Sequence, residues 1–477
     1  MTEHNLILMT DSYKASHFLQ YPPGTSRLFG YLESRGGHYK ETTFFGLQYL
    51  LRRYLAQQVT EIDVQEAAAF FRAHGEPFPE EGWRRVVEKH GGYVPLRIRA
   101  VAEGSVVPVR NVLMTVESTD PELFWLVSWL ETVLMRVWYP TTVATLSWHI
   151  KKRIYEYLIK TSDDPAGEVL FKLHDFGARG VSSAESAGIG GAAHLVNFLG
   201  SDTVEGALLA HHYYGVEGGA GMPAFSIPAA EHSTIIAWGR GREKDAYRNM
   251  LTQFAKPGSI VACVSDSYDL WNAIENIWGD DLKDEVESSG CTLVIRPDSG
   301  DPPEVCLKAI MILERKVGCR KNMKGYKVLP KSWRLIQGDG NDDEEAVARV
   351  LEALTKSGYS ATNIAFGMGG GLLQKVNRDT QRFAFKVSVV TIDGKDIPVS
   401  KNPVTDPGKA SKAGFVDLVI RDGKYETVTR TSPAPERDDG YSRLETVYEN
   451  GDMKKSSCSL DGIRHRARQA MEQELGL

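Results

Sequence analysis

Residues 174–180, with the sequence HDFGARG, combine a histidine, an aspartate, an aromatic ring and an arginine in one short stretch. Further charged residues follow other short apolar runs of the chain: Arg296, Arg378, Asp266, Asp298 and Asp339. Guanidinium groups match phosphate oxygens with paired hydrogen bonds, whereas carboxylates accept hydrogen bonds from sugar hydroxyls or hold Mg²⁺ beside a diphosphate. This mixture, with Arg179, therefore indicates a phosphorylated sugar as the ligand.

A glycine run, Gly369, Gly370 and Gly371, precedes a helical pattern, which would let backbone N–H groups approach a phosphate. Taken alone, a strand-end aspartate is more often a helix cap, and a glycine trio is as often a tight turn. The repetition of such residues after successive apolar runs favours one shared site.

His232 lies in the sequence PAAEHST, residues 228–234. An imidazole there could act as a nucleophile or carry a proton near neutral pH. A lone histidine is more often a structural residue, and the following Ser233 and Thr234 equally suit the start of a helix.

The elements that must position these residues alternate from about residue 168 onward. We expect strands at 169–173, 260–264, 293–295, 334–337 and 364–366. Helical patterns follow them, among others at 305–313 and at Val347, Val350, Leu351 and Leu354. Such alternation predicts parallel strands with right-handed crossovers. Because the polar residues come just after the strands, we favour an α/β barrel, with a doubly wound sheet as the alternative.

Residues 1–150 and 385–477 do not keep this rhythm, and we assign them to a flanking α+β domain beside a catalytic barrel-like domain at 151–384. Within the flanking part, residues 387–392 are expected to form a strand that enters a hairpin turn at Asp393 and Gly394.

The composition is that of an ordinary globular protein, with 477 residues, 42% of them hydrophobic and 25% charged. A formal net charge of -6 gives no global attraction to nucleic acid or anionic membrane, so local Arg and Lys must meet an anionic ligand. The five cysteines are scattered and odd in number, which favours a reducing compartment over disulfides or a zinc site.

Two segments bear on the membrane question. Residues 1–10 lack the basic start and apolar run of a signal peptide. Residues 123–138 are strongly apolar, but Glu131 and Arg136 interrupt them, so we expect a buried core helix instead of a membrane span.

As a set, the motifs resemble the nicotinamide phosphoribosyltransferase family nearly end to end. The stretches that carry the resemblance are TDSYK, YPP, HDFGARGVSSAESAGIGGAAHLVNF, GSDTVEG, PAAEHST, VSDSYD, IRPDSG, IQGDG, FGMGGGLLQK and DPGKASKAG. The resemblance implies a barrel of the quinolinate phosphoribosyltransferase type, a cytoplasmic homodimer with two active sites at the subunit interface, and no nucleic-acid or membrane partner. The implied reaction transfers phosphoribosyl from 5-phosphoribosyl-1-pyrophosphate to nicotinamide in NAD salvage, with Mg²⁺ and with ATP as co-substrate.

The resemblance also implies roles for the nicotinamide site. Phe176 would stack on one face of the ring and Tyr13 of the partner subunit on the other, while Asp202 would accept a hydrogen bond from the carboxamide. His232 would be phosphorylated by ATP. The further residues implied are Asp11 and Ser226 at the substrate, and Asp266 and Asp298 beside His232 as catalytic residues.

The remaining implied contacts are to the sugar, the phosphates and the leaving group. Arg179 and Arg296 would bind the nucleotide phosphate, and Mg²⁺ would be held mainly through pyrophosphate. Ribose and phosphate would be held by Asp298, Gly338, Asp339, Gly369 and Gly370. The pyrophosphate side would be contacted by Arg378 and Lys386, with Lys401 and Lys409 near it.

The sequence departs from the family pattern at Ala178 and Met368, where tyrosine and serine are frequent, and this affects the fine shape of the pocket. Two alternatives stay open: a nicotinate phosphoribosyltransferase, and a non-catalytic protein that binds NAD precursors. Asp202 favours nicotinamide, because nicotinate would bring two anions together in a partly desolvated pocket.

Overall fold

The computed structural model describes residues 5–215, 221–338, 340–341, 343–405, 409–433, 441–454 and 458–477. The chain forms two compact units. Unit 1 comprises Met1–Thr145, His212–Gly219 and Asn377–Ala470, and unit 2 comprises Leu146–His211, Ala220–Val376 and Met471–Leu477. Against the expected borders near residues 150 and 385, the chain passes between units at 145 and 377, and its last seven residues belong to unit 2.

Unit 2 contains a five-stranded parallel sheet in a mixed α/β arrangement, with the strand order β6-β12-β11-β8-β7. Its strands are β6 (Leu173–Asp175), β7 (Ile260–Val264), β8 (Thr292–Arg296), β11 (Trp333–Gln337) and β12 (Ile364–Met368). Four of the five expected strands are thereby confirmed. Each is short and almost wholly buried, as strands covered on both faces should be.

The strand expected at 169–173 is wrong in its position. Asp164 caps the short helix α6 (Pro165–Glu168), and the chain continues as the 3-10 turn η5 (Val169–Phe171) before β6 begins at Leu173. Val169 and Leu173, which lie about one helical turn apart, are both buried. The first part of this apolar run therefore forms a helical turn that buries Val169 and leaves Phe171 half exposed, which the sequence pattern did not reveal.

Short extended segments continue the parallel pairing beyond both edges of this sheet. Asp175 of β6 bridges Ser201, Gly200 bridges Phe225, and Ala229 bridges Ala262 of β7. Each bridge carries backbone hydrogen bonds, including those from Asp175 N–H to the Gly200 carbonyl and from Ala230 N–H to the Ala262 carbonyl. Successive parallel bridges thus lead from β6 back to β7.

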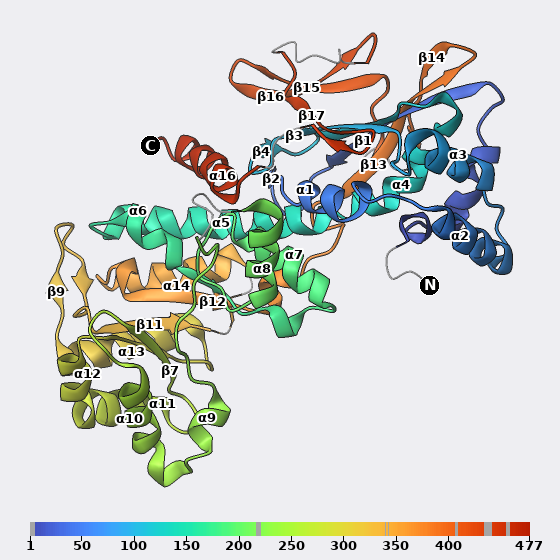
Figure 1. The fold of residues 1–477 in the computed structure, drawn as a ribbon. Coiled ribbons are helices and arrows are strands. Elements are labelled where there is room, and N and C mark those ends of the chain that lie inside the picture. The colour runs from blue at the N-terminus through green and yellow to red at the C-terminus, as the bar shows by residue number, and fades with distance from the viewer. Residues whose placement is uncertain are drawn as a thin grey trace. The chain divides into compact units, whose positions relative to one another are not determined.

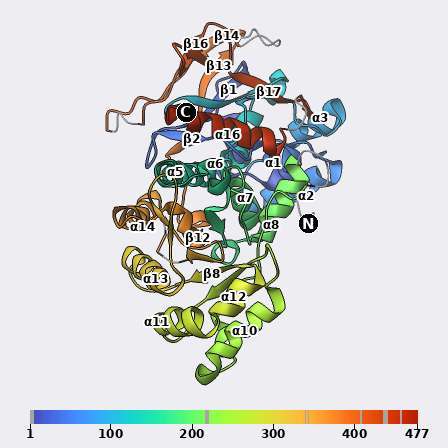
Figure 2. The same ribbon diagram turned by 90° about the vertical axis from the view of Figure 1, so that its left-hand side faces the viewer.

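Helices flank the sheet of unit 2 (Figure 2). They are α7 (Ala184–His194), α8 (Val204–Tyr214), α9 (His232–Ile236), α10 (Glu243–Phe254), α11 (Leu270–Asn272), the π-helical η8 (Ala273–Asp281), α12 (Lys283–Ser289), α13 (Pro302–Val317), α14 (Glu344–Lys356) and α15 (Gly370–Leu373). The helix expected at 305–313 is confirmed as α13. The apolar face expected for α14 is buried as well, from Val347 to Leu354.

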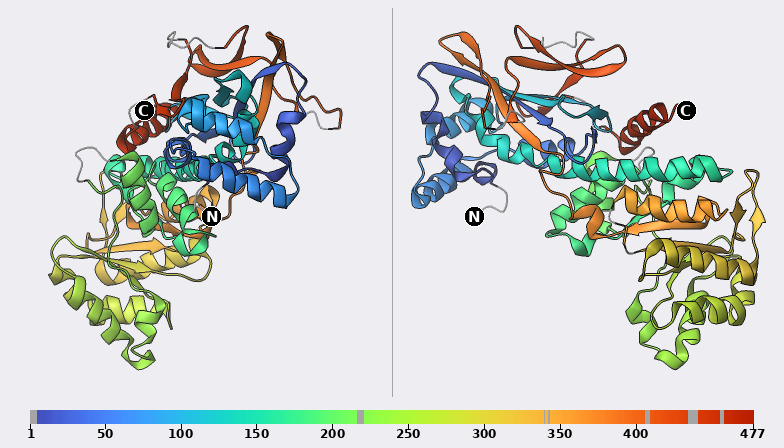
Figure 3. Two further views of the ribbon diagram at one scale, coloured as in Figure 1. Left: turned by 45° about the vertical axis from the view of Figure 1, so that its right-hand side comes forward. Right: turned by 180° about the vertical axis from the view of Figure 1, so that it is seen from behind.

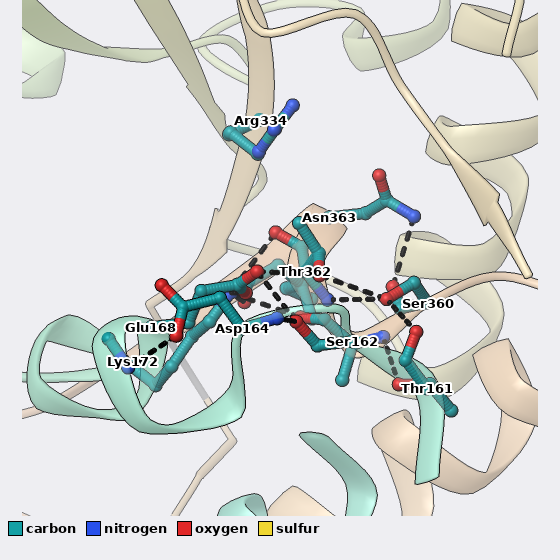
Figure 4. A network of polar contacts seen from close by, with 12 residues as sticks. Thr161, Ser162, Asp164, Glu168, Lys172, Arg334, Ser360, Thr362 and Asn363 are labelled. Atoms are coloured by element: carbon teal, nitrogen blue, oxygen red, sulfur yellow. Dashed lines mark hydrogen bonds and ion pairs between the residues drawn. The ribbon is translucent and has the colours of Figure 1, made fainter. Parts of the chain in front are cut away.

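A buried polar network fixes the start of β6 against the start of β12 (Figure 4). The Lys172 ammonium donates to the carbonyls of Ala361, Thr362 and Ile364 at 3.0–3.1 Å and lies 3.3 Å from a Glu168 oxygen. Glu168 in turn accepts the Thr362 hydroxyl at 2.9 Å. Burial lowers the pKa of Lys172 to about 8. The network closes the end of the sheet opposite to the polar loops.

Unit 1 contains a seven-stranded sheet, in which the first and last thirds of the chain lie side by side (Figures 1 and 3). In sheet order its strands are β14 (Lys395–Pro398), β13 (Phe383–Ile392), β1 (Thr25–Ser34), β5 (Val112–Ser118), β3 (Leu96–Val101), β17 (Leu444–Glu449) and β18 (Asp452–Met453). Neighbouring strands are antiparallel. The expected hairpin at Asp393 and Gly394 is confirmed as the β13–β14 turn, with φ of 49° and 76°.

Smaller elements complete the chain. The pairs β2 (Glu41–Thr43) with β4 (Val106–Pro108), β15 (Phe415–Arg421) with β16 (Lys424–Arg430), and β9 (Arg320–Lys321) with β10 (Lys327–Val328) are two-stranded. The remaining longer helices are α2 (Glu61–His74), α3 (Glu80–His90), α4 (Leu126–Met135), α5 (Trp138–Thr161) and α16 (Leu460–Glu474), and α1 (Leu47–Leu50) is a single short turn.

The apolar stretch 123–138 forms the buried helix α4, as expected, although α4 ends at Met135 and Trp138 begins α5. Glu131 and Arg136 lie where the helix surface is partly exposed. Among the described residues, no helix has the length and apolar character needed to span a bilayer.

Candidate active site

Phe176 lies at the carboxyl end of β6, against Gly367 of β12, which has no side chain. Its N–H donates to the Met368 carbonyl at 3.2 Å, and the buried Asp175 carboxylate accepts the Gly177 N–H at 2.8 Å. A Cβ atom at Gly367 would lie only 1.9 Å from the Phe176 ring, so glycine at this position is what allows the ring to lie across the strand. The HDFG motif therefore places an aromatic plate at the strand ends.

Asp202 is tied directly to the residue before that plate, because its N–H donates to the Asp175 carbonyl at 2.7 Å. His174 Nε2 lies 2.9 Å from Asp202 Oδ1, and the Ser226 hydroxyl donates to the same oxygen. Burial alone would raise the pKa of Asp202, but the contacts from His174 and Ser226 bring it below its ordinary value. Asp202 is therefore an anion at neutral pH, and its backbone is bound to the residue that precedes Phe176.

His232 and Asp266 form a second polar centre in unit 2. His232 begins α9, and its Nε2 lies 2.9 Å from Oδ1 of Asp266, which follows β7. The other oxygen of Asp266 accepts the Ser299 hydroxyl at 2.7 Å and the Asp298 N–H at 3.0 Å. Burial alone would raise the pKa of Asp266. Hydrogen bonds from Ser299, His232 and Asp298 outweigh this effect, so the pKa lies below its ordinary value. This carboxylate orients both the histidine and the loop after β8.

Arg296 and Asp298, at the end of β8, meet Gly338 at the end of β11. Arg296 Nη2 lies 3.9 Å from Asp298 Oδ2, and a Cβ at Gly338 would lie 2.7 Å from the other Asp298 oxygen. Three predicted site residues therefore lie together at neighbouring strand ends. Asp339, the next predicted residue, lies outside the described residues.

The glycine run begins α15, with Gly369 at its N-cap and Gly370 as its first residue. Gly180, which ends the turn η6 (Ala178–Gly180), lies close to it, since a Cβ at Gly180 would be 3.2 Å from the Gly370 Cα. The turn that carries Arg179 therefore lies beside Gly370, and, apart from its own helix and chain neighbours, no atom of the described residues would lie within 4 Å of a Cβ at Gly370.

Unit 1 holds a separate group of predicted residues around one cavity of about 600 Å³. Its basic lining residues include the predicted Arg378, Lys386, Lys401 and Lys409 and also Arg35, Arg110 and Arg382. Among the described lining residues, Glu131 and Asp379 are the acidic ones. Such a cavity suits a multiply charged anion, for example a diphosphate.

The sequence reasoning missed Arg35, Arg110 and Arg382, because the antiparallel pairing of β1 with β13 brings distant segments to this cavity. Arg110 and Arg382 have φ of 67° and 48°, a conformation that is uncommon in residues other than glycine. The sequence did not predict this backbone conformation either. Burial and nearby Arg35 lower the pKa of Lys386, although the carboxylate of Glu131 acts in the opposite direction.

Asp11 and Tyr13 also belong to unit 1. The Thr132 hydroxyl donates to Asp11 at 2.8 Å, and Tyr13 follows on the 3-10 helix η2 (Ser12–Leu19) with 58% of its surface exposed. Lys14 binds Glu131, a lining residue of the basic cavity, at 2.7 Å. The exposed tyrosine is therefore adjacent along the chain to a residue anchored at that cavity.

Profiles of two related families match the chain. That of the nicotinamide phosphoribosyltransferase N-terminal domain matches residues 5–98, and that of the nicotinate phosphoribosyltransferase family matches residues 171–452. The nicotinamide phosphoribosyltransferase of Xanthomonas campestris pv. campestris is 56% identical over 97% of this chain and 98% of its own. The chain belongs to the nicotinamide phosphoribosyltransferase family.

More distant members of this family confirm the extent of the match. The nicotinamide phosphoribosyltransferase of Acinetobacter baylyi is 31% identical, over 97% of each chain. Two solved structures share the fold: nicotinate-nucleotide pyrophosphorylase from Pyrococcus furiosus (TM-score 0.61, 14% identity, 100% of this chain and 98% of that one) and human nicotinic acid phosphoribosyltransferase (TM-score 0.56, 17% identity, 97% and 93%).

Proposed function

We propose that this protein transfers the 5-phosphoribosyl group of 5-phosphoribosyl-1-pyrophosphate to nicotinamide, giving nicotinamide mononucleotide and pyrophosphate in NAD salvage. The observation that carries the choice of substrate is the anionic Asp202, whose N–H binds the carbonyl of Asp175, the residue before Phe176, together with 56% identity to a nicotinamide phosphoribosyltransferase. A carboxylate accepts the carboxamide N–H of nicotinamide but repels the carboxylate of nicotinate. We place the nicotinamide ring on the face of Phe176 and its amide at the Asp202 carboxylate.

In this reaction the pyridine nitrogen forms a bond to C1′ of the sugar while the bond from C1′ to the pyrophosphate oxygen breaks. The nitrogen attacks with its lone pair and has no proton to lose, so no general base is needed. The protein's part is to hold the ring and the sugar in line, to exclude water and to stabilise the departing charge. Arg296, Asp298 and Gly338 would hold the ribose and its phosphate, together with Arg179, Gly369 and Gly370. Asp339, which the resemblance also implies, lies outside the described residues.

The leaving pyrophosphate would be stabilised by the basic cavity of unit 1, through Arg378, Lys386, Lys401 and Lys409. Mg²⁺ would supply further positive charge to stabilise the leaving pyrophosphate. Among the described residues, no group of three or more histidine, cysteine or acidic side chains could hold a metal ion.

ATP would act at His232. Asp266 engages Nε2, which leaves Nδ1 as the nitrogen that attacks the γ-phosphorus, with release of ADP. A carboxylate on the far side of the ring stabilises the charge that the imidazole gains when it forms the N–P bond. Hydrolysis of this phosphohistidine would couple ATP to product formation.

We further propose that the active site is shared between two copies of the chain in a homodimer. The exposed Tyr13 of unit 1 would stack on the nicotinamide face opposite to Phe176 of the partner copy, beside Asp11. In unit 2, the bridges from β6 through 200–201 and 225–229 to β7 support closure of the sheet as an irregular (β/α) barrel. The free cysteines support activity in a reducing cytoplasm.

The test supplies purified protein with the activated sugar and Mg²⁺, plus nicotinamide or nicotinate, with and without ATP, and identifies the nucleotide by mass. We expect nicotinamide mononucleotide, with more of it when ATP is present. Nicotinate mononucleotide as the main product would establish the rival phosphoribosyltransferase instead. Binding of nicotinamide without release of pyrophosphate would indicate a non-catalytic protein.

A further inference from the structure

We propose that His174 determines the specificity of the nicotinamide site by positioning the Asp202 carboxylate, so that one oxygen of Asp202 is held by the protein and the other is kept for the substrate amide. This inference rests on the proposed function and assigns a role to a residue that the sequence reasoning had left without one.

The first observation is that both protein contacts of the carboxylate go to the same atom. His174 Nε2 lies 2.9 Å from Asp202 Oδ1, and the Ser226 hydroxyl donates to that same Oδ1. In the described part of the chain no hydrogen bond or ion pair reaches Oδ2, and the Asp202 side chain is 42% exposed. The carboxylate is thus satisfied on one side and open on the other.

The second observation is that the His174 ring has little freedom to move. Its backbone pairs with Gly367 in β12, between the buried Leu173 and Asp175. The Gly200 backbone lies close to the Nδ1 edge of the ring, since a Cβ at Gly200 would be 2.6 Å from His174 Nδ1. The ring is held between strand and glycine backbone with Nε2 directed at Asp202.

Together these contacts define what the site can accept. With a carboxylate as its partner, His174 Nε2 is the donor, since an ionised carboxylate only accepts. Two donors on Oδ1 fix the plane of the group, so Oδ2 keeps a fixed position for the amide N–H of nicotinamide. A freely rotating carboxylate would have to be ordered at each binding event, which costs affinity for the amide substrate.

His174 is therefore a positioning residue, and it acts through Asp202. His174→Phe removes the donor while it keeps a ring of similar shape, and we expect kcat/KM for nicotinamide to fall about tenfold or more, as is typical for loss of a charge-assisted hydrogen bond. The KM for 5-phosphoribosyl-1-pyrophosphate should stay unchanged. His174→Gln keeps a neutral N–H donor and should retain most of the activity. His465→Gln on α16, where the side chain is exposed, is the matched control and should behave as wild type.

The decisive comparison is a double-mutant cycle with Asp202→Asn. If His174 acts through the carboxylate, His174→Phe should reduce nicotinamide turnover strongly in the wild-type background and hardly at all in Asp202→Asn. Equal fold-losses in both backgrounds would overturn the inference, as would an equal loss with His174→Gln and His174→Phe when urea unfolding shows both variants folded. A wild-type protein that makes no nicotinamide mononucleotide would instead refute the proposed function, so the two failures are distinguishable.

Discussion

His232 Nε2 lies 2.9 Å from Asp266 Oδ1, and the second oxygen of Asp266 accepts hydrogen bonds from the loop after β8. The same carboxylate therefore orients the proposed phosphate acceptor and the backbone of Asp298. Asp266 therefore links the proposed site of ATP use to the sugar-binding loop. For this reason, changing His232 and changing Asp266 should have different effects on the reaction.

His232→Ala should abolish the stimulation of synthesis by ATP and leave slow, ATP-independent formation of nicotinamide mononucleotide. Asp266→Asn should keep the histidine but reduce its phosphorylation by about tenfold or more, because the imidazolium loses its anionic partner. Both effects are measured with γ-³²P-labelled ATP and by product formation with and without ATP. Wild-type protein that takes up no label would remove the phosphohistidine from the mechanism.

Gly367→Ala should weaken nicotinamide binding, because the new Cβ would lie 1.9 Å from the Phe176 ring and would displace it. We expect KM for nicotinamide to rise about tenfold, the order of effect of losing a well-placed aromatic contact. Gly241→Ala is the matched control, since nothing lies within 4 Å of the added atom. Steady-state kinetics of the two variants should differ; an unchanged KM in Gly367→Ala would mean that Phe176 does not stack on the substrate.

Shared active sites predict complementation between two inactive variants, Tyr13→Ala and Phe176→Ala. In a randomly mixed homodimer about half of the dimers are mixed, and each of these has one intact site, so about a quarter of the wild-type activity should return. Co-expression with two affinity tags and purification on both isolates the mixed dimer alone, which should show about half of the wild-type activity. If mixed dimers stay as inactive as each parent, both residues serve a site within one copy.

Acid should destabilise unit 2 through His194, which is fully buried with Nδ1 3.1 Å from the Ser147 hydroxyl oxygen and Nε2 3.2 Å from the Gly200 carbonyl. Burial lowers the pKa of His194 from 6.5 to about 3. Below pH 6.5 the unfolded histidine binds a proton that the folded one does not, so the free energy of unfolding falls as pH falls towards 3. The loss is at most about 1.4 kcal/mol per pH unit.

His194→Gln has no such titration, so its stability should change less between pH 6.5 and 4.5 than that of the wild type. Urea unfolding at several pH values measures both proteins, and the carboxylates common to both cancel in the comparison. Parallel pH profiles would show that His194 is protonated in the folded protein.

Much of unit 2 was predictable because its signals are local. Short apolar runs followed by polar loops gave four of the five strands, and the HDFG, VSDSYD and IRPDSG motifs lie at strand ends as expected. The exception is the run that begins at Val169, where the 3-10 turn η5 replaces the first part of the expected strand. Periodicity over five residues does not distinguish a strand from a helical turn, and the structure leaves Phe171 of this run half exposed.

Relationships that depend on distant segments were not predictable. Pairing of β1 with β13 brings Arg35 and Arg382 to one cavity, and nothing in either local sequence indicates this. The contact of His174 with Asp202 likewise depends on the bridge between Asp175 and Ser201, which aligns two motifs 26 residues apart. The residue types were evident from the sequence, whereas the choice of partners required the fold.

A competition experiment tests the central claim most directly. The wild-type protein receives equal concentrations of nicotinamide and nicotinate with a limiting amount of 5-phosphoribosyl-1-pyrophosphate, and mass spectrometry counts the two mononucleotides. Repulsion between Asp202 and the nicotinate carboxylate predicts that nicotinamide mononucleotide dominates, and that Asp202→Asn moves the ratio towards nicotinate. Equal amounts of both products from the wild-type protein, or a ratio that Asp202→Asn leaves unchanged, would contradict the account.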